Sequence, residues 1–243
     1  MPRNDDTPQL GGERRDAEGD LAEAGARRTI PDISGDPDAY GRLIDIIGTM
    51  TSSGVRADAL YQRALTRASA DPEFVTLVAK TSASLEEDAY EERWALTQLL
   101  IDLESPEAAD ALVELVRAPI PPEKAEDPSH GLSTVTEEVI LRTTAIEGLS
   151  RLLRRDVDTS DTLLETISSS DYVALRRASW FALVDGGRED AIEKARSILT
   201  DRGDAWIIEL KRIPVEEAPQ ADREQIGRAK PRPRRPLPEP FDG

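Results

Sequence analysis

The chain has 243 residues and a net charge of −17, which repels phosphate backbones and anionic membrane surfaces and argues against nucleic acid as a partner of the folded part. It contains no cysteine, which excludes disulfides, thiolate metal sites and cysteine nucleophiles. Hydrophobic residues make up 38% and aromatic residues 4%. A core must therefore be built from Leu, Ile, Val and Ala, which favours helices over strands.

The first 36 residues are rich in glycine and charge and have almost no periodic apolar pattern. They predict a disordered arm, 1–36, ahead of a folded body that covers 37–213. The arm has no apolar stretch long enough for a signal peptide. The longest apolar run of the chain, from Trp180 to Val184, is far shorter than the roughly 20 residues of a membrane span. We expect a cytoplasmic protein with no membrane contact.

Signals for helix starts recur along the body. Asp36, Asp71 and Ser105 each precede a proline, so each offers a side-chain acceptor at an N-cap and a proline in the first turn. Ser84 and Glu87 have the spacing of a capping box. Together with the apolar periodicity, these signals predict an all-α protein. The expected helices cover 37–49, 55–69, 72–82, 85–103, 106–117, 135–154, 159–169, 172–185, 189–201 and 204–212.

Three segments of the body can be aligned as one helix-turn-helix unit. They cover 85–117, 135–169 and 172–201. Each first helix carries an Arg two or three residues before an Ala, namely Arg93 before Ala95, Arg142 before Ala145 and Arg176 before Ala178. The second helix of each unit has one apolar stripe, whereas the first helix is apolar on more than one side. This pattern indicates that each first helix packs on its partner and also on the next unit.

The three units resemble HEAT-like repeats, whose first helix carries an apolar run after such an Arg and Ala step. The resemblance covers 85–201, and residues 37–82 could form a further, worn pair. It implies a right-handed α-solenoid in which the second helices line a concave side that binds proteins. A minority of HEAT-like proteins bind DNA or act as lyases on bilin pigments. An enzyme of this kind, a bilin lyase or a DNA-repair glycosylase, is therefore the alternative.

Motifs of catalysis and metal binding are missing from the sequence. There is no glycine-rich phosphate loop, no nucleophile elbow and no metalloprotease helix. The single histidine, His130, lies in a proline-rich insertion over 118–133 and has no second histidine beside it. We expect a non-enzymatic protein without cofactor or metal. Core positions are expected for the three tryptophans, Trp94, Trp180 and Trp206.

Acidic residues lie opposite the apolar stripe of each second helix on a helical wheel. Stacked second helices would align these residues into one ridge. One interpretation is a solvated face that keeps the protein soluble. The other is a concave acidic groove that binds a basic segment of another protein, of which an immunity-type inhibitor of a basic toxin would be one form. The residues are Glu107, Asp110, Glu114, Asp161, Glu165, Asp190 and Glu193.

The last part of the chain, 214–243, is so rich in proline that it predicts an extended tail without helix. It carries a basic cluster made of Arg228, Lys230, Arg232, Arg234 and Arg235. The cluster could dock on the acidic body, bind another protein or touch nucleic acid. The sequence thus predicts a binding or adaptor protein with the acidic solenoid as its main site and the tail as a second contact.

Overall fold

The computed structural model describes residues 30–52, 54–125 and 133–210, and within these ranges it is helical with no strand. Nearly all of these residues belong to the first of two units into which the chain divides, Met1–Ile208 and Glu209–Gly243. The helices are α2 (Pro37–Thr51), α3 (Val55–Ala68), α4 (Pro72–Ala83), α5 (Tyr90–Leu103), the short 3-10 helix η1 (Pro106–Ala108), α6 (Ala109–Arg117), α7 (Thr134–Leu153), α8 (Ser160–Ser169), α9 (Val173–Gly186), α10 (Glu189–Asp201) and α11 (Trp206–Glu209).

The predicted arm and tail fall almost wholly outside the described residues, as does His130. The end of the arm is an exception. Ile30 is buried in the core, and its carbonyl oxygen accepts a hydrogen bond of 2.9 Å from the Tyr40 hydroxyl. The packed structure therefore includes residues ahead of Pro37, where the sequence predicted that the body begins.

Two of the four predicted helix-start signals are confirmed. Asp36 and Asp71 each accept hydrogen bonds from backbone N–H groups in the first turn of their helices, so both predicted N-caps are confirmed. Ser105 does not cap its helix. Its hydroxyl donates to the carboxylate of Glu107 instead, and the chain passes through η1 before α6 begins.

The capping box predicted at Ser84 and Glu87 is wrong, and α5 begins at Tyr90 instead of residue 85. Ser84 is the C-cap of α4, and its hydroxyl donates to the Thr81 carbonyl over 2.8 Å. A serine between two helices can cap the end of the first or the start of the second, and Ser84 caps the end of α4. The turn is held by Arg93, whose guanidinium donates to the Glu87 carbonyl over 3.0 Å.

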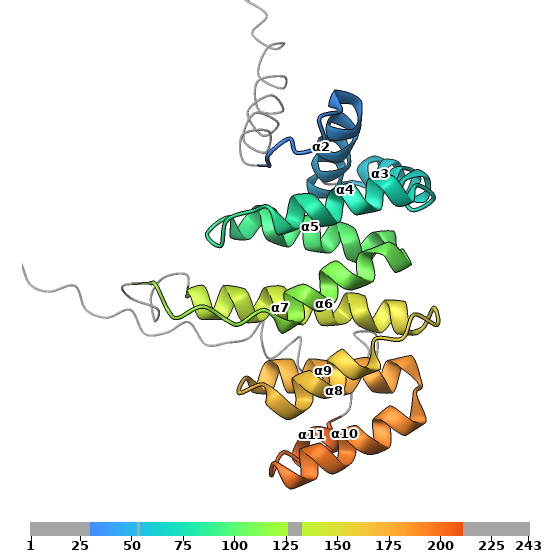
Figure 1. The fold of residues 1–243 in the computed structure, drawn as a ribbon. Coiled ribbons are helices and arrows are strands. Elements are labelled where there is room, and N and C mark those ends of the chain that lie inside the picture. The colour runs from blue at the N-terminus through green and yellow to red at the C-terminus, as the bar shows by residue number, and fades with distance from the viewer. Residues whose placement is uncertain (1–29, 53, 126–132, 211–243) are drawn as a thin grey trace, which may run out of the picture. The chain divides into compact units, whose positions relative to one another are not determined.

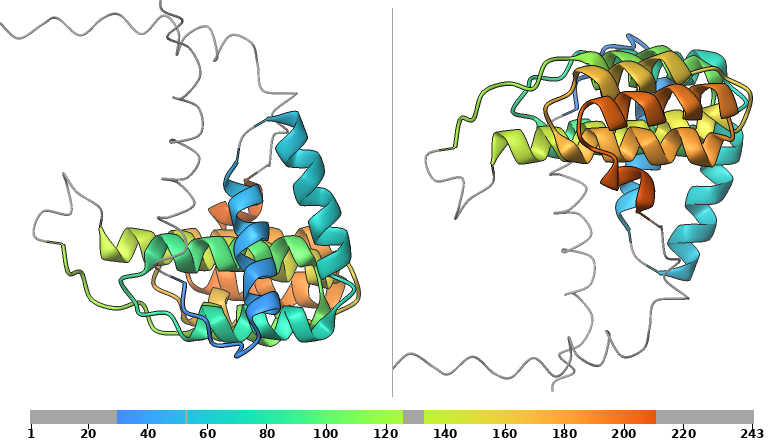
Figure 2. Two further views of the ribbon diagram at one scale, coloured as in Figure 1. Left: turned by 90° about the horizontal axis from the view of Figure 1, so that it is seen from above. Right: turned by 90° about the horizontal axis from the view of Figure 1, so that it is seen from below.

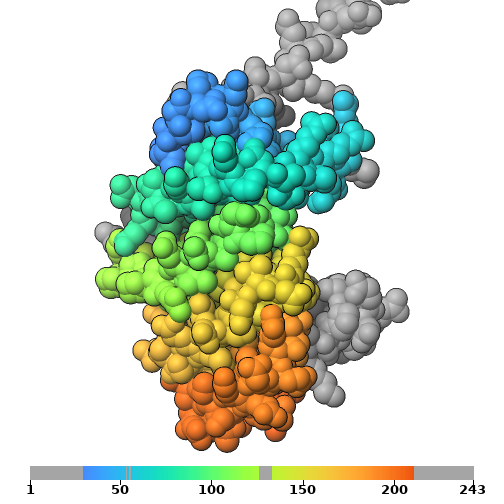
Figure 3. Space-filling model, turned by 45° about the vertical axis from the view of Figure 1, so that its right-hand side comes forward, coloured from blue at the N-terminus to red at the C-terminus, as the bar shows by residue number. Residues whose placement is uncertain are grey.

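The helices pack in two rows (Figures 1 and 2). In the first row α5, α7 and α9 contact one another in that order, and in the second row α4, α6, α8 and α10 do the same. α2 and α3 run across the other helices at one end (Figure 2). The helices succeed one another from α2 in blue to α10 in orange along the face shown in Figure 3.

The main contacts between the rows join different predicted units. α6 packs chiefly on α7 and α8 packs chiefly on α9, so that the second helix of one unit lies against the first helix of the next. α4 packs on α5 in the same manner, and it also contacts η1. α4 is therefore a full member of the second row, although the sequence offered 37–82 only as a worn pair.

The core is aliphatic, as the composition predicts. Leu96, Leu99 and Leu149 are fully buried between the rows. Trp180 is also buried, but Trp94 and Trp206 are 38% and 46% exposed. The core position expected for all three tryptophans is therefore wrong for two of them. Aliphatic side chains, and not Trp94 or Trp206, fill the core of the closely packed helices.

The Arg that marks each predicted unit has the same role in all three. It reaches from a first-row helix to the chain that follows the preceding second-row helix and donates to a backbone carbonyl there. Because Arg142 and Arg176 are buried, these carbonyls take the place of water as their partners. The bonds are Arg93 to Glu87 (3.0 Å), Arg142 to Ala118 (3.1 Å) and Pro119 (2.9 Å), and Arg176 to Ser170 (2.8 Å).

A buried carboxylate joins two of these arginines. Glu138 of α7 forms ion pairs with Arg93 of α5 and with Arg142 of its own helix, and its side chain is 3% exposed. Burial opposes the ionisation of Glu138, but the two guanidinium groups outweigh this effect and hold its pKa below the ordinary value. The carboxylate thus fixes α5 to α7 at a point that water does not reach.

Glu138→Gln removes the negative charge and leaves two guanidinium groups without a counter-ion in a buried place. We expect the free energy of unfolding at neutral pH to fall by about 3 kcal/mol or more. The folded pKa lies below the unfolded value of 4.5, so the carboxylate stabilises the fold above that pH and progressively less below it. Urea unfolding at neutral pH and at about pH 3 should therefore show the two proteins converging in acid. Equal stability at neutral pH would contradict the prediction.

Gly148 lies at the point of α7 that side chains of α5 and α6 approach closely. A Cβ at this position would stand 2.7 Å from Cγ1 of Ile101 and 2.8 Å from Cδ1 of Leu112. Gly148→Ala should therefore lower the free energy of unfolding by about 1–3 kcal/mol, the usual cost of overpacking. Gly41→Ala on α2 is the matched control, since nothing lies within 4 Å of the added methyl group. The control should be more stable than the parent protein by about 0.5–1 kcal/mol in urea unfolding, and a stabilised Gly148→Ala would refute the close approach.

Candidate functional site

All seven acidic residues predicted on the second helices are exposed. Glu107 lies in η1, and the other six lie on α6, α8 and α10, which are neighbours in the second row. Their surroundings nevertheless differ. Glu107, Asp110 and Glu114 line one groove, and the other four lie outside it. The four are Asp161, Glu165, Asp190 and Glu193.

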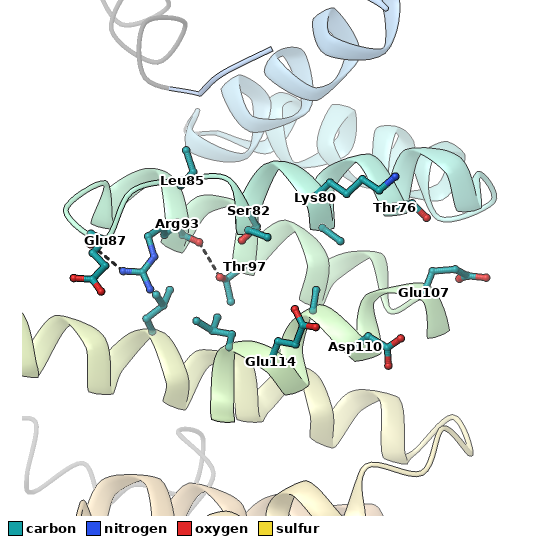
Figure 4. A pocket seen from close by; sticks show the side chains of 15 residues that line it. Thr76, Lys80, Ser82, Leu85, Glu87, Arg93, Thr97, Glu107, Asp110 and Glu114 are labelled. Atoms are coloured by element: carbon teal, nitrogen blue, oxygen red, sulfur yellow. Dashed lines mark hydrogen bonds between the residues drawn. The ribbon is translucent and has the colours of Figure 1, made fainter. Parts of the chain in front are cut away.

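The groove lies between α4 on one side and η1 and α6 on the other, and has a volume of about 410 Å³ (Figure 4). Lys80 and Thr76 come from α4, whereas Asp110 and Glu114 come from α6. Buried and half-buried apolar side chains complete the groove between these polar rims. They are Ala79, Leu85, Ala111, Leu115 and Leu141.

The carboxylates of the groove outnumber the cations that face them. Asp110 and Glu114 are one helical turn apart on the same side of α6, and neither forms an ion pair with a described residue. Glu107 accepts a hydrogen bond from the Ser105 hydroxyl, which lowers the pKa of its carboxyl and keeps it ionised. Lys80 is the cation on the facing wall, and it has no ion-pair partner among the described residues. This part of the groove is therefore negative.

Two further charged residues at the other end of the groove are already paired (Figure 4). Arg93 is held by the buried Glu138. Glu87 forms an exposed ion pair of 2.7 Å with Lys124, and this carboxylate raises the pKa of the lysine. The charge of the groove thus depends mainly on the three carboxylates of η1 and α6 and on Lys80.

The remaining predicted residues divide into two kinds. Glu165 forms an ion pair of 2.8 Å with Arg117, which joins α8 to α6 beside a smaller hollow of about 300 Å³. Asp161, Asp190 and Glu193 pair with no described residue and line neither this hollow nor the groove. The predicted ridge is thus interrupted at Arg117, and only its α6 part borders a groove.

The α4 wall of the groove was not predicted from the sequence. Residues 37–82 were predicted only as a possible further pair, although Arg56 stands three residues before Ala59, and α4 was not aligned with the second helices. Its apolar stripe of Phe74, Val75 and Val78, together with its Asp71 cap, is the signal that could have placed it. Lys80 follows from that alignment as a residue on the facing wall.

The residues predicted as a second contact in the tail lie outside the described residues. They are Arg228, Lys230, Arg232, Arg234 and Arg235. The candidate site therefore consists of the groove.

Within the described ranges, no three side chains of His, Cys, Asp or Glu are arranged to hold a metal ion. None of the helices there has both the length and the apolar character needed to cross a membrane. The chain matches no family model, no curated protein and no solved structure. Its function must be inferred from the groove and the charges around it.

Proposed function

We propose that this protein is a non-enzymatic binding or adaptor protein of the HEAT-like α-solenoid kind, and that the groove between α4 and α6 binds a basic segment of another protein. The observation that carries the proposal is the excess of carboxylates over cations beside an apolar surface. Asp110 and Glu114 have no described ion-pair partner, and Lys80 alone opposes them from α4.

The groove suits the side chains of lysine and arginine in particular. Their aliphatic stems can lie on Ala111, Leu115 and Leu85, while the charged heads reach the carboxylates at the rim. A charge-assisted hydrogen bond is roughly twice as strong as a neutral one, and arginine can make two in parallel to one carboxylate. A volume of about 410 Å³ accommodates a few such side chains of a peptide segment.

The HEAT-like assignment is supported by the two rows and by the common role of the unit arginines. In such a solenoid the second row, α4, α6, α8 and α10, lines the concave side, and the groove would lie on it. The cytoplasmic location expected from the sequence stays a prediction. An immunity-type inhibitor of a basic toxin is one form that this binding could take.

The enzyme alternatives receive less support from the groove. A DNA-repair glycosylase needs a surface that attracts phosphates, and Asp110 and Glu114 repel them. A lyase needs a side chain that can hold a proton for transfer, and at Glu107 the Ser105 hydroxyl lowers the pKa of the carboxyl instead.

Charge reversal at two places on the second row tests the proposal. Asp110→Lys with Glu114→Lys changes the groove, and Asp190→Lys with Glu193→Lys makes the same change of net charge on α10. The probe is a fluorescent synthetic peptide with four arginines and one leucine, and its binding is followed by anisotropy at low and moderate salt. We expect the groove variant to bind about tenfold more weakly, mainly through a slower association rate, and the α10 variant to bind nearly as the parent does.

Equal losses in the two variants would mean that the probe responds to the net charge of −17 and not to the groove, which would contradict the proposal. A labelled DNA duplex serves as the second probe. Tighter binding of the duplex than of the peptide would favour the glycosylase alternative instead.

A further inference from the structure

A hollow of about 1010 Å³, separate from the smaller one beside Arg117, opens at the turn between α4 and α5. Pro31, Leu85, Ala89 and Tyr90 give it an apolar wall. Its charged residues are all acidic, and none of the described Lys or Arg residues lines it. They are Glu86, Asp88, Glu91, Glu92 and Glu137.

Helix stability explains part of this acidity but not all of it. Glu91 and Glu92 lie in the first turn of α5, where the helix dipole favours negative charge. Glu137 lies in the first turn of α7, where the dipole of that helix has the same effect, so only Glu86 and Asp88, which precede α5, are left without this explanation. None of the five forms an ion pair with a described residue. Burial, and then the charges of Glu137 and Glu138, raise the pKa of the Tyr90 hydroxyl, as expected in a negative field.

The hollow and the groove meet at Leu85, which lines both. A cation of the chain already pairs with Glu87, which lines the groove. The Nζ atom of Lys124 is 2.7 Å from the carboxylate of Glu87, and Glu87, followed by Asp88, raises the pKa of the lysine. Both partners are more than half exposed, so an incoming ammonium or guanidinium group can compete for Glu87.

We infer that the groove and the hollow form one continuous docking surface, and that its occupant is a segment of another protein with two basic clusters on either side of an apolar residue. This inference rests on the proposed function and specifies the partner. One cluster lies against Asp110 and Glu114, the apolar residue packs at Leu85, and the second cluster lies among the carboxylates around Tyr90. Lys124 acts as an internal competitor for Glu87.

Two labelled synthetic peptides distinguish this surface from the groove alone. The first has a pair of arginines on each side of a single leucine, with alanine spacers, and the second has one of the pairs replaced by alanine. The parent protein should bind the first about fivefold more tightly than the second. Glu91→Lys with Glu92→Lys should remove this preference. Glu91→Gln with Glu92→Gln should reduce it, and it retains helix propensity if the reversed charges weaken the start of α5.

Lys124→Met removes the internal competitor and should tighten the first peptide about twofold, whereas the matched change Lys194→Met on α10 should leave it unaltered. Circular dichroism melting verifies that each variant is folded. A preference for the first peptide that survives both changes at Glu91 and Glu92, while reversal at Asp110 and Glu114 still weakens binding about tenfold, would overturn the inference and leave the proposed function intact. If the parent binds neither peptide, the proposed function itself fails.

Discussion

The ion pairs of the buried Glu138 determine how the first row is assembled. This carboxylate can remain ionised away from water only because Arg93 and Arg142 both contact it. Arg142 also donates to the carbonyls of Ala118 and Pro119, so the same cluster fixes α5, α7 and the chain after α6. In the next unit, Arg176 occupies the equivalent place with another counter-ion. Its Nε lies 2.8 Å from Asp204, although not in the orientation of a hydrogen bond.

The position of the groove depends on this cluster. Arg93 donates to the Glu87 carbonyl while it pairs with Glu138, and so the turn that carries Leu85 is fixed relative to α7. The same pairing explains the charge of the surface. Because Arg93 is used within the fold, its cation does not offset the carboxylates at the rim, and Lys80 is left as the cation that faces them. The negative groove is thus a consequence of how the rows are held together.

The sequence predicted the helices well because their starts and stripes depend on neighbours a few residues away. At the start of α4, for example, Asp71 accepts from the Phe74 N–H and Pro72 occupies the first turn, so the start can be predicted locally even though Asp71 also pairs with Arg42 of α2. The prediction was wrong at Ser84, where two helices compete for one side chain and local spacing does not distinguish them. It was also wrong at Trp94, because the exposure of a first-row side chain depends on which neighbours flank the helix.

The candidate site could be predicted only in part for a similar reason. Asp110 and Glu114 share one helix, so their common face follows from the helical period. Lys80 and Glu137 approach their sites from other helices, and their places depend on the packing of α6 against α7 and of α4 against α5. The local sequence pattern does not show whether a second helix packs chiefly on the first helix of its own unit, as in a hairpin, or on the first helix of the next unit, as observed here.

The arginine bonds to backbone carbonyls have a further consequence, for the kinetics of recognition. Arg93 attaches α5 to the turn after α4, and Arg142 attaches α7 to the chain after α6, so both walls of the groove are fixed to the first row before anything binds. A preformed receptor loses little conformational entropy on association, and nearly all the ordering falls on the incoming segment. Recognition of this kind resembles rigid docking, in which related ligands differ chiefly in how long they stay bound.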